Sequence, residues 1–186
     1  MKAALSLGIV LSTGLGVERI DPPDVPGIEV KSARWGHVRP EDSSLLVEWS
    51  RGMRNGGVSS VALVASSRGV PVAQKSVPES DGAYNGGVVF VSGAGGPEGS
   101  PYQFARDVAT PVFLMCGVDE SDRVLYRMDM LKNLLLSQGK ETCLKQYDGN
   151  HGFLADNEEA QSDMRGFLRW TLAGGGRPEW FTKCPK

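Results

Sequence analysis

Ser67 is placed where a side chain could act as a nucleophile. It follows the apolar, β-prone run of residues 61–65, and Gly69 comes two residues after it. A strand that ends in a tight turn before a helix projects a serine hydroxyl away from the backbone. Small residues two before and two after the serine are needed because neighbouring strands crowd such a turn, and Ala65 and Gly69 meet that need. The same pattern also occurs in ordinary loops.

Acidic residues and a histidine follow two later apolar runs. The loop of residues 117–124 carries Asp119 and Asp122, and His151 lies in the loop after the last apolar run. A serine hydroxyl is a weak nucleophile at neutral pH, and an imidazole can accept its proton during attack. A carboxylate fixes the tautomer of that imidazole and stabilises the imidazolium. The order serine, acid, histidine therefore predicts nucleophilic catalysis without a metal or an organic cofactor.

Two aspartates compete for the role of the acid. Asp119 lies nearer to the end of its strand, whereas Asp122 fits an Asp-x-x-apolar pattern if Leu125 takes the apolar place. We expect Asp122 to be the acid, with Asp119 as the alternative.

Apolar runs separated by helical patterns predict the elements that position these residues. Strands are expected over residues 7–11, 28–33, 61–65, 87–93, 110–117 and 142–147, and helices over residues 45–53, 70–77, 128–137 and 160–172. Strands that are apolar on both faces indicate a parallel sheet covered on both sides. The sequence therefore predicts an α/β fold, a mostly parallel sheet with helices on both faces. Functional residues of such folds gather beyond the carboxyl ends of the strands.

Composition limits the class of protein and its partners. The 186 residues suffice for one domain, residues 1–186, in which residues 177–186 read as a surface tail. A net charge of −2 favours neither nucleic acid nor an anionic membrane as a partner. No apolar run reaches the roughly 18 residues of a membrane-spanning helix. The oligomeric state stays open.

The N-terminus and the three cysteines leave alternatives open. Residues 1–16 form either a first core strand with its loop or a signal peptide; we favour the strand, and with it a cytoplasmic over an extracytoplasmic location. Cys116 lies in an apolar run and is expected to be buried. A disulfide between Cys143 and Cys184 is possible, but spacing cannot decide it. The absence of a CxxC pair argues against structural zinc.

From about residue 42 to residue 172 the sequence resembles an α/β-hydrolase of the dienelactone-hydrolase and prolyl-oligopeptidase-like branch, with a shortened N-terminal part. Residues 61–69 resemble the nucleophile elbow, residues 111–117 resemble the strand before the acidic loop, and Tyr147-Asp148-Gly149-Asn150-His151-Gly152-Phe153 is similar to the family's Tyr-x-Gly-x-His-Gly-Phe signature. The resemblance implies Ser67 as nucleophile, His151 as general base and an aspartate after Gly117 as the acid.

The resemblance also implies an oxyanion hole made of two backbone N–H groups. One belongs to Arg68, and the other to Leu15 if Thr13 stands in the histidine place of the family's His-Gly-x loop. Ala65 departs from the family pattern in the elbow, and Val70 departs from it just after the elbow.

The expected function is that of a carboxylesterase acting on a small acyl ester. A peptidase or a thioesterase is possible with the same triad, because the fold does not determine the leaving group. A hydrolase-like protein without catalysis, serving as a binding module, is the alternative from another class.

Overall fold

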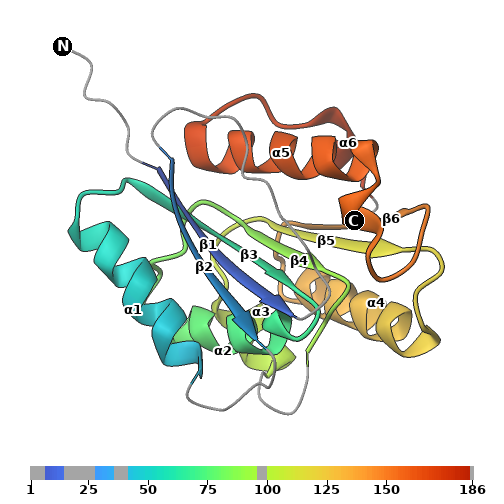
Figure 1. Ribbon diagram of the computed structural model, residues 1–186, viewed down its shortest axis with the longest axis horizontal. Helices are drawn as coiled ribbons and strands as arrows, with labels where there is room; N and C mark the ends of the chain where they lie inside the picture. Colours follow the sequence, from blue (N-terminus) through green and yellow to red (C-terminus); the bar gives the residue numbers. More distant parts are fainter. Residues whose placement is uncertain (1–6, 15–27, 36–41, 96–99, 185–186) are drawn as a thin grey trace.

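A computed structural model describes residues 7–14, 28–35, 42–95 and 100–184 of the chain. Their strands form one six-stranded parallel sheet in the order β2-β1-β3-β4-β5-β6 (Figure 1). The strands are β1 (Leu7–Gly14), β2 (Ile28–Trp35), β3 (Ser60–Ser66), β4 (Val88–Val91), β5 (Val112–Gly117) and β6 (Thr142–Tyr147). The direction of winding reverses between β1 and β3, and this is the place where ligands bind in open α/β sheets.

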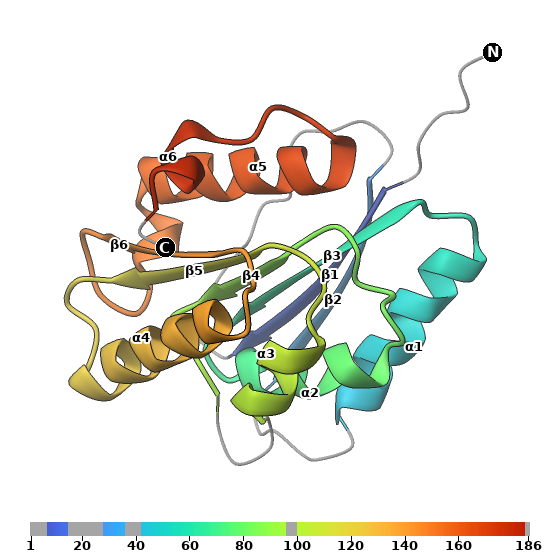
Figure 2. The ribbon, with the colours of Figure 1, turned by 180° about the vertical axis from the view of Figure 1, so that it is seen from behind.

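Helices cover both faces of this sheet. One face carries α1 (Asp42–Asn55), α2 (Gly69–Glu79), α3 (Pro101–Asp107) and α4 (Asp122–Ser137), and the other carries the 3₁₀ turn η1 (Phe153–Ala155), α5 (Glu158–Ala173) and α6 (Glu179–Thr182). Figures 1 and 2 show the two helical layers on opposite sides of the strands. The expected α/β architecture is confirmed. Among the described helices, none combines the length and the apolarity needed to span a membrane.

The central strands are buried on both faces, as their unbroken apolar runs predict. In β3, Val61 and Leu63 pack toward α1 and α2, whereas Ala62 and Val64 pack toward α5. All four side chains are fully buried. Because successive side chains of a strand point to opposite faces, a run without polar residues supplies both cores at once.

Three helical segments differ from the expectation. α4 begins at Asp122, six residues before the expected start at Met128. Val124 and Leu125 in its first turn are half-buried and pack on the core at helical spacing from Met128, so the apolar period extends further toward the N-terminus than expected. α3 and α6 were not expected, since seven and four residues are too few to reveal a helical period.

The N-terminal strand lies inside the sheet. Leu7–Gly14 pairs with β2 on one side and with β3 on the other, in parallel register. For residues 7–14 the structure therefore has the strand that we favoured. Leu15 lies outside the described residues.

The C-terminal segment is more than the expected surface tail. Phe181 in α6 is 2% exposed and contacts the rings of Phe113 and Phe167, at centroid distances of 6.5 and 5.4 Å. A disulfide joins Cys184 to Cys143 in β6, with 5.6 Å between their Cα atoms. The segment therefore belongs to the helical layer over one face of the sheet.

The third cysteine, Cys116, is free and fully buried, as expected. Burial raises the pKa of its thiol to about 11, so the thiol stays protonated at neutral pH.

Reduction of the disulfide should destabilise the protein. The bridge closes a loop over a sequence separation of 41 residues, and a loop of that size contributes about 2–4 kcal/mol. We expect reductant to lower the Tm by roughly 5–15 °C in a calorimetric scan. The double variant Cys143→Ser/Cys184→Ser is the control, since its Tm should already be low and should not respond to reductant. A wild-type Tm that ignores reductant would contradict the prediction.

Candidate active site

Ser67 lies in the turn between β3 and α2, in a backbone conformation that few residues adopt. Its φ is +50°, in the left-handed region. The N–H of Ser67 donates to the carbonyl oxygen of Val91 at 2.9 Å, and its own carbonyl oxygen accepts from the N–H of Val70 at 3.1 Å. These bonds hold the turn in place, so the surrounding structure stabilises a conformation that would otherwise cost about 1–3 kcal/mol. The predicted strand–turn–helix geometry at Ser67 is confirmed.

The neighbouring strand ends in the same way and leaves no room for a side chain beneath the turn. Ser92, just after β4, also has a left-handed φ of +51°, and its N–H donates to the carbonyl oxygen of Met115 at 2.8 Å. A Cβ on Gly93 would lie 2.8 Å from the carbonyl oxygen of Ser67 and 2.9 Å from a methyl carbon of Val70. Glycine at position 93 is therefore required for the turn to pack against the loop after β4.

The loop that carries His151 is tied to the loop that follows β5. The N–H of Val118 donates to the carbonyl oxygen of Tyr147 at 2.8 Å, and the N–H of Asp119 donates to that of Gly149 at 3.0 Å. A Cβ on Gly117 would overlap the Gly149 carbonyl oxygen and lie 2.7 Å from that of Asn150. The two loops thus touch backbone to backbone, which only glycine permits at position 117.

A chain of hydrogen bonds joins three side chains across the carboxyl end of the sheet. His151 Nε2 lies 2.8 Å from Ser67 Oγ, and His151 Nδ1 lies 3.0 and 3.1 Å from the two carboxyl oxygens of Glu120. The Glu120 side chain is 3% exposed, whereas that of His151 is 45% exposed. A carboxylate only accepts hydrogen bonds, so Nδ1 carries the proton and Nε2 faces the serine as the acceptor.

The acid that faces His151 is a glutamate, and the expectation of an aspartate is wrong. Asp122 is exposed and forms the first residue of α4, and Asp119 is exposed with its backbone bound to Gly149. Glu120 lies between them, and its side chain alone points inward to the imidazole. A search of the same loop for either acid would have included it, since triads use aspartate or glutamate.

The predicted oxyanion donors are placed only in part. Arg68 follows Ser67 and forms the N-cap of α2, at the positive end of that helix dipole. The other donor, Leu15, falls outside the described residues. Within residues 7–14, 28–35, 42–95 and 100–184, no group of three His, Cys, Asp or Glu side chains could hold a metal ion.

Solved structures with the same arrangement of elements exist, although no protein-family model and no curated protein sequence matches the chain. A puromycin-hydrolysing peptidase of Mycobacterium tuberculosis superposes with a TM-score of 0.71 at 14% identity, over 96% of this chain and 36% of that one. A thermophilic esterase of Thermogutta terrifontis, solved with butyrate bound, gives 0.68 at 16% identity, over 92% and 86%. The esterase PE8 gives 0.66 at 17% identity, over 91% and 94%.

The chain has the α/β-hydrolase fold. Its match to these structures extends over more than nine-tenths of its length. The chain spans about two fifths of the length of the peptidases, at 36%, 39% and 40% for three of them. It spans most of the length of the two esterases.

A methyl group at position 117 should displace the histidine loop of this α/β-hydrolase fold. In Gly117→Ala the new Cβ overlaps the Gly149 carbonyl, so we expect a loss of about 1–3 kcal/mol of stability, measured by urea unfolding. Gly52→Ala is the matched control, because a Cβ on Gly52 in α1 has no neighbour within 4 Å, and alanine favours a helix by about 1 kcal/mol. Equal stability of the two variants would refute the close approach.

Proposed function

We propose that the protein is a serine hydrolase that cleaves carboxylic esters through an acyl-enzyme on Ser67. The observation that carries this proposal is the unbroken hydrogen-bond chain from Ser67 through His151 to the shielded carboxylate of Glu120. A non-catalytic binding module would not need a strained serine turn aimed at an imidazole whose other nitrogen meets a buried acid.

The reaction follows from the roles of the three groups. Ser67 Oγ bonds to the carbonyl carbon of the ester while its proton passes to His151 Nε2. The bond to the leaving oxygen then breaks, and the leaving alcohol takes that proton from the imidazolium. A water molecule repeats the sequence on the acyl-enzyme and releases the carboxylic acid. Glu120 holds the imidazole by Nδ1 and stabilises its positive charge in both halves.

The developing oxyanion needs donors close to Ser67. The backbone N–H of Arg68 follows the nucleophile at the start of α2, where the helix dipole also favours negative charge. One such donor typically lowers the activation barrier by about 3–4 kcal/mol. Leu15 stays a prediction for the second donor.

We infer a small acyl ester as the substrate class. Two of the solved structures with this fold are esterases, one of them with butyrate bound. A peptide or a thioester is the alternative substrate for the same three side chains, because the fold does not determine the leaving group.

A fluorophosphonate probe tests the nucleophile. We expect it to label Ser67 in the wild type, to leave Ser67→Ala unlabelled, and to react about 10²–10⁴-fold more slowly with His151→Ala, because the serine then lacks its proton acceptor. Intact-protein and peptide mass spectrometry locate the adduct. A folded wild type that takes no label would favour the binding-module alternative.

Substitutions in the acid loop test the assignment of Glu120. Glu120→Gln should lower kcat for p-nitrophenyl butyrate by about 10³–10⁴-fold, since the amide cannot stabilise the imidazolium. Asp119→Asn and Asp122→Asn are matched controls in the same loop, and each should stay within about threefold of wild type. A dead Asp122→Asn with an active Glu120→Gln would restore the aspartate that we first expected.

A further inference from the structure

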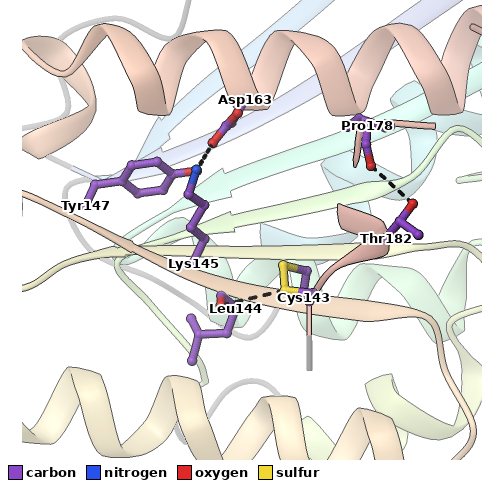
Figure 3. Close-up of a disulfide and its surroundings, with 8 residues drawn as sticks. Cys143, Leu144, Lys145, Tyr147, Asp163, Pro178 and Thr182 are labelled. Atoms are coloured by element: carbon purple, nitrogen blue, oxygen red, sulfur yellow. Dashed lines mark hydrogen bonds and ion pairs between the residues drawn. A yellow bond between two sulfur atoms is a disulfide. The ribbon is translucent and has the colours of Figure 1, made fainter. Parts of the chain in front are cut away.

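Three side chains of β6 point away from the helix α4 and toward the layer of α5 and α6. They are Cys143, Lys145 and Tyr147, at alternate positions along the strand. Cys143 forms the disulfide, and Figure 3 shows Lys145 and Tyr147 converging on Asp163 of α5.

Asp163 is the centre of this group. Its Oδ2 accepts from the hydroxyl of Tyr147 at 2.8 Å and from Lys145 Nζ at 2.5 Å. Asp163 is 8% exposed, and a carboxylate so deeply buried needs partners for its charge. Lys145 Nζ also donates to Glu159 at 2.7 Å and lies 5.0 Å from the centre of the Tyr147 ring.

The surroundings of Tyr147 and Lys145 raise the pKa of both side chains. Burial and the nearby Asp163 carboxylate raise the pKa of Tyr147 well above its ordinary value, so its hydroxyl remains a donor. Burial acts against the positive charge of Lys145, but hydrogen bonds to Asp163 and Glu159 outweigh it and raise the lysine pKa. The hydrogen bond from Tyr147 to Asp163 is therefore present throughout the neutral range.

Tyr147 is the last residue of β6 and leads directly into the loop of His151. Its carbonyl oxygen accepts from Val118 in the acid loop. Its ring stacks on that of Phe153, with 5.5 Å between centroids and 9° between planes. The N–H of Phe153 in turn donates to the carbonyl oxygen of Asn150, so the tyrosine contacts both ends of the loop.

We propose that Asp163 and Tyr147 are positioning residues for His151: their hydrogen bond fixes the start of the histidine loop on the rigid helix α5. The inference rests on the proposed hydrolase function of the same site. The contact between Tyr147 of β6 and Asp163 of α5 would then affect catalysis at Ser67.

The place of β6 in the sheet explains why such an anchor is needed. β6 is the last strand of the described sheet and pairs with β5 alone, so one of its edges has no strand beside it. The loop after β6 must nevertheless place an imidazole nitrogen 2.8 Å from Ser67 Oγ, and Ser67 follows β3, which is three strand positions away. A misplacement of about 1 Å at a catalytic group can cost about 100-fold in rate.

The variant Tyr147→Phe tests the proposal, because it removes the hydroxyl and keeps the ring that stacks on Phe153. With p-nitrophenyl butyrate we expect kcat to fall about 10-fold or more while KM stays within about twofold, the pattern of a lost transition-state interaction. The rate of fluorophosphonate labelling at Ser67 should fall in parallel. The low-field proton resonance of His151 Nδ1–H should shift or broaden.

Two further variants separate positioning from stability. Asp163→Asn keeps an oxygen acceptor for Tyr147 and should retain most of the kcat that Tyr147→Phe loses. Glu159→Gln is the matched control, since Glu159 contacts Lys145 but is itself 68% exposed, and its kcat should equal that of the wild type.

The outcomes distinguish this inference from the proposed function. A wild type that neither takes the probe nor cleaves the ester refutes the hydrolase function itself. An active wild type with an unchanged kcat and Nδ1 resonance in Tyr147→Phe refutes the positioning role alone. The positioning role is also refuted if the fall in kcat of Tyr147→Phe and of Asp163→Asn simply follows the fall in Tm of each variant.

Discussion

The reach of His151 across the sheet is the constraint on which the rest of the site depends. β3 and β6 are three strand positions apart, which is roughly 14 Å at the spacing of hydrogen-bonded strands. Yet Ser67 Oγ and His151 Nε2 lie 2.8 Å apart. The histidine loop must therefore run back over the end of β5, and it can do so because Gly117 offers bare backbone to it. The contact of the two loops also brings the Glu120 carboxyl group to 3.0 Å from His151 Nδ1.

Two strained turns at the carboxyl end of the sheet are stabilised by the packing around them. Ser67 and Ser92 both adopt left-handed conformations, and each is held by a hydrogen bond from its N–H to the neighbouring strand. Both faces of those strands are buried in the two helical layers. The apolar core thus supplies the free energy that keeps two unfavourable turns in register with each other.

The layer of α5 and α6 buries one face of the sheet and also holds the edge strand β6. It binds the edge strand β6 through the disulfide at Cys143, the buried carboxylate of Asp163 and a cluster of aromatic rings around Phe181. Without this layer β6, the strand that leads into the histidine loop, would contact only β5 and α4. The C-terminal segment therefore stabilises the strand from which the histidine loop begins.

Sequence by itself determined the parallel α/β fold, the serine turn and the histidine, because unbroken apolar runs and small residues around Ser67 are local signals. Only the folded structure shows which acid faces His151: Asp119, Glu120 and Asp122 are all carboxylates in one loop, and Glu120 is the one whose side chain turns inward to the imidazole. Tertiary structure also decided the Cys143–Cys184 bridge and the burial of Phe181, since both join segments about forty residues or more apart in the chain. The spacing of residues along a chain does not show which distant segments pack against each other in the folded protein.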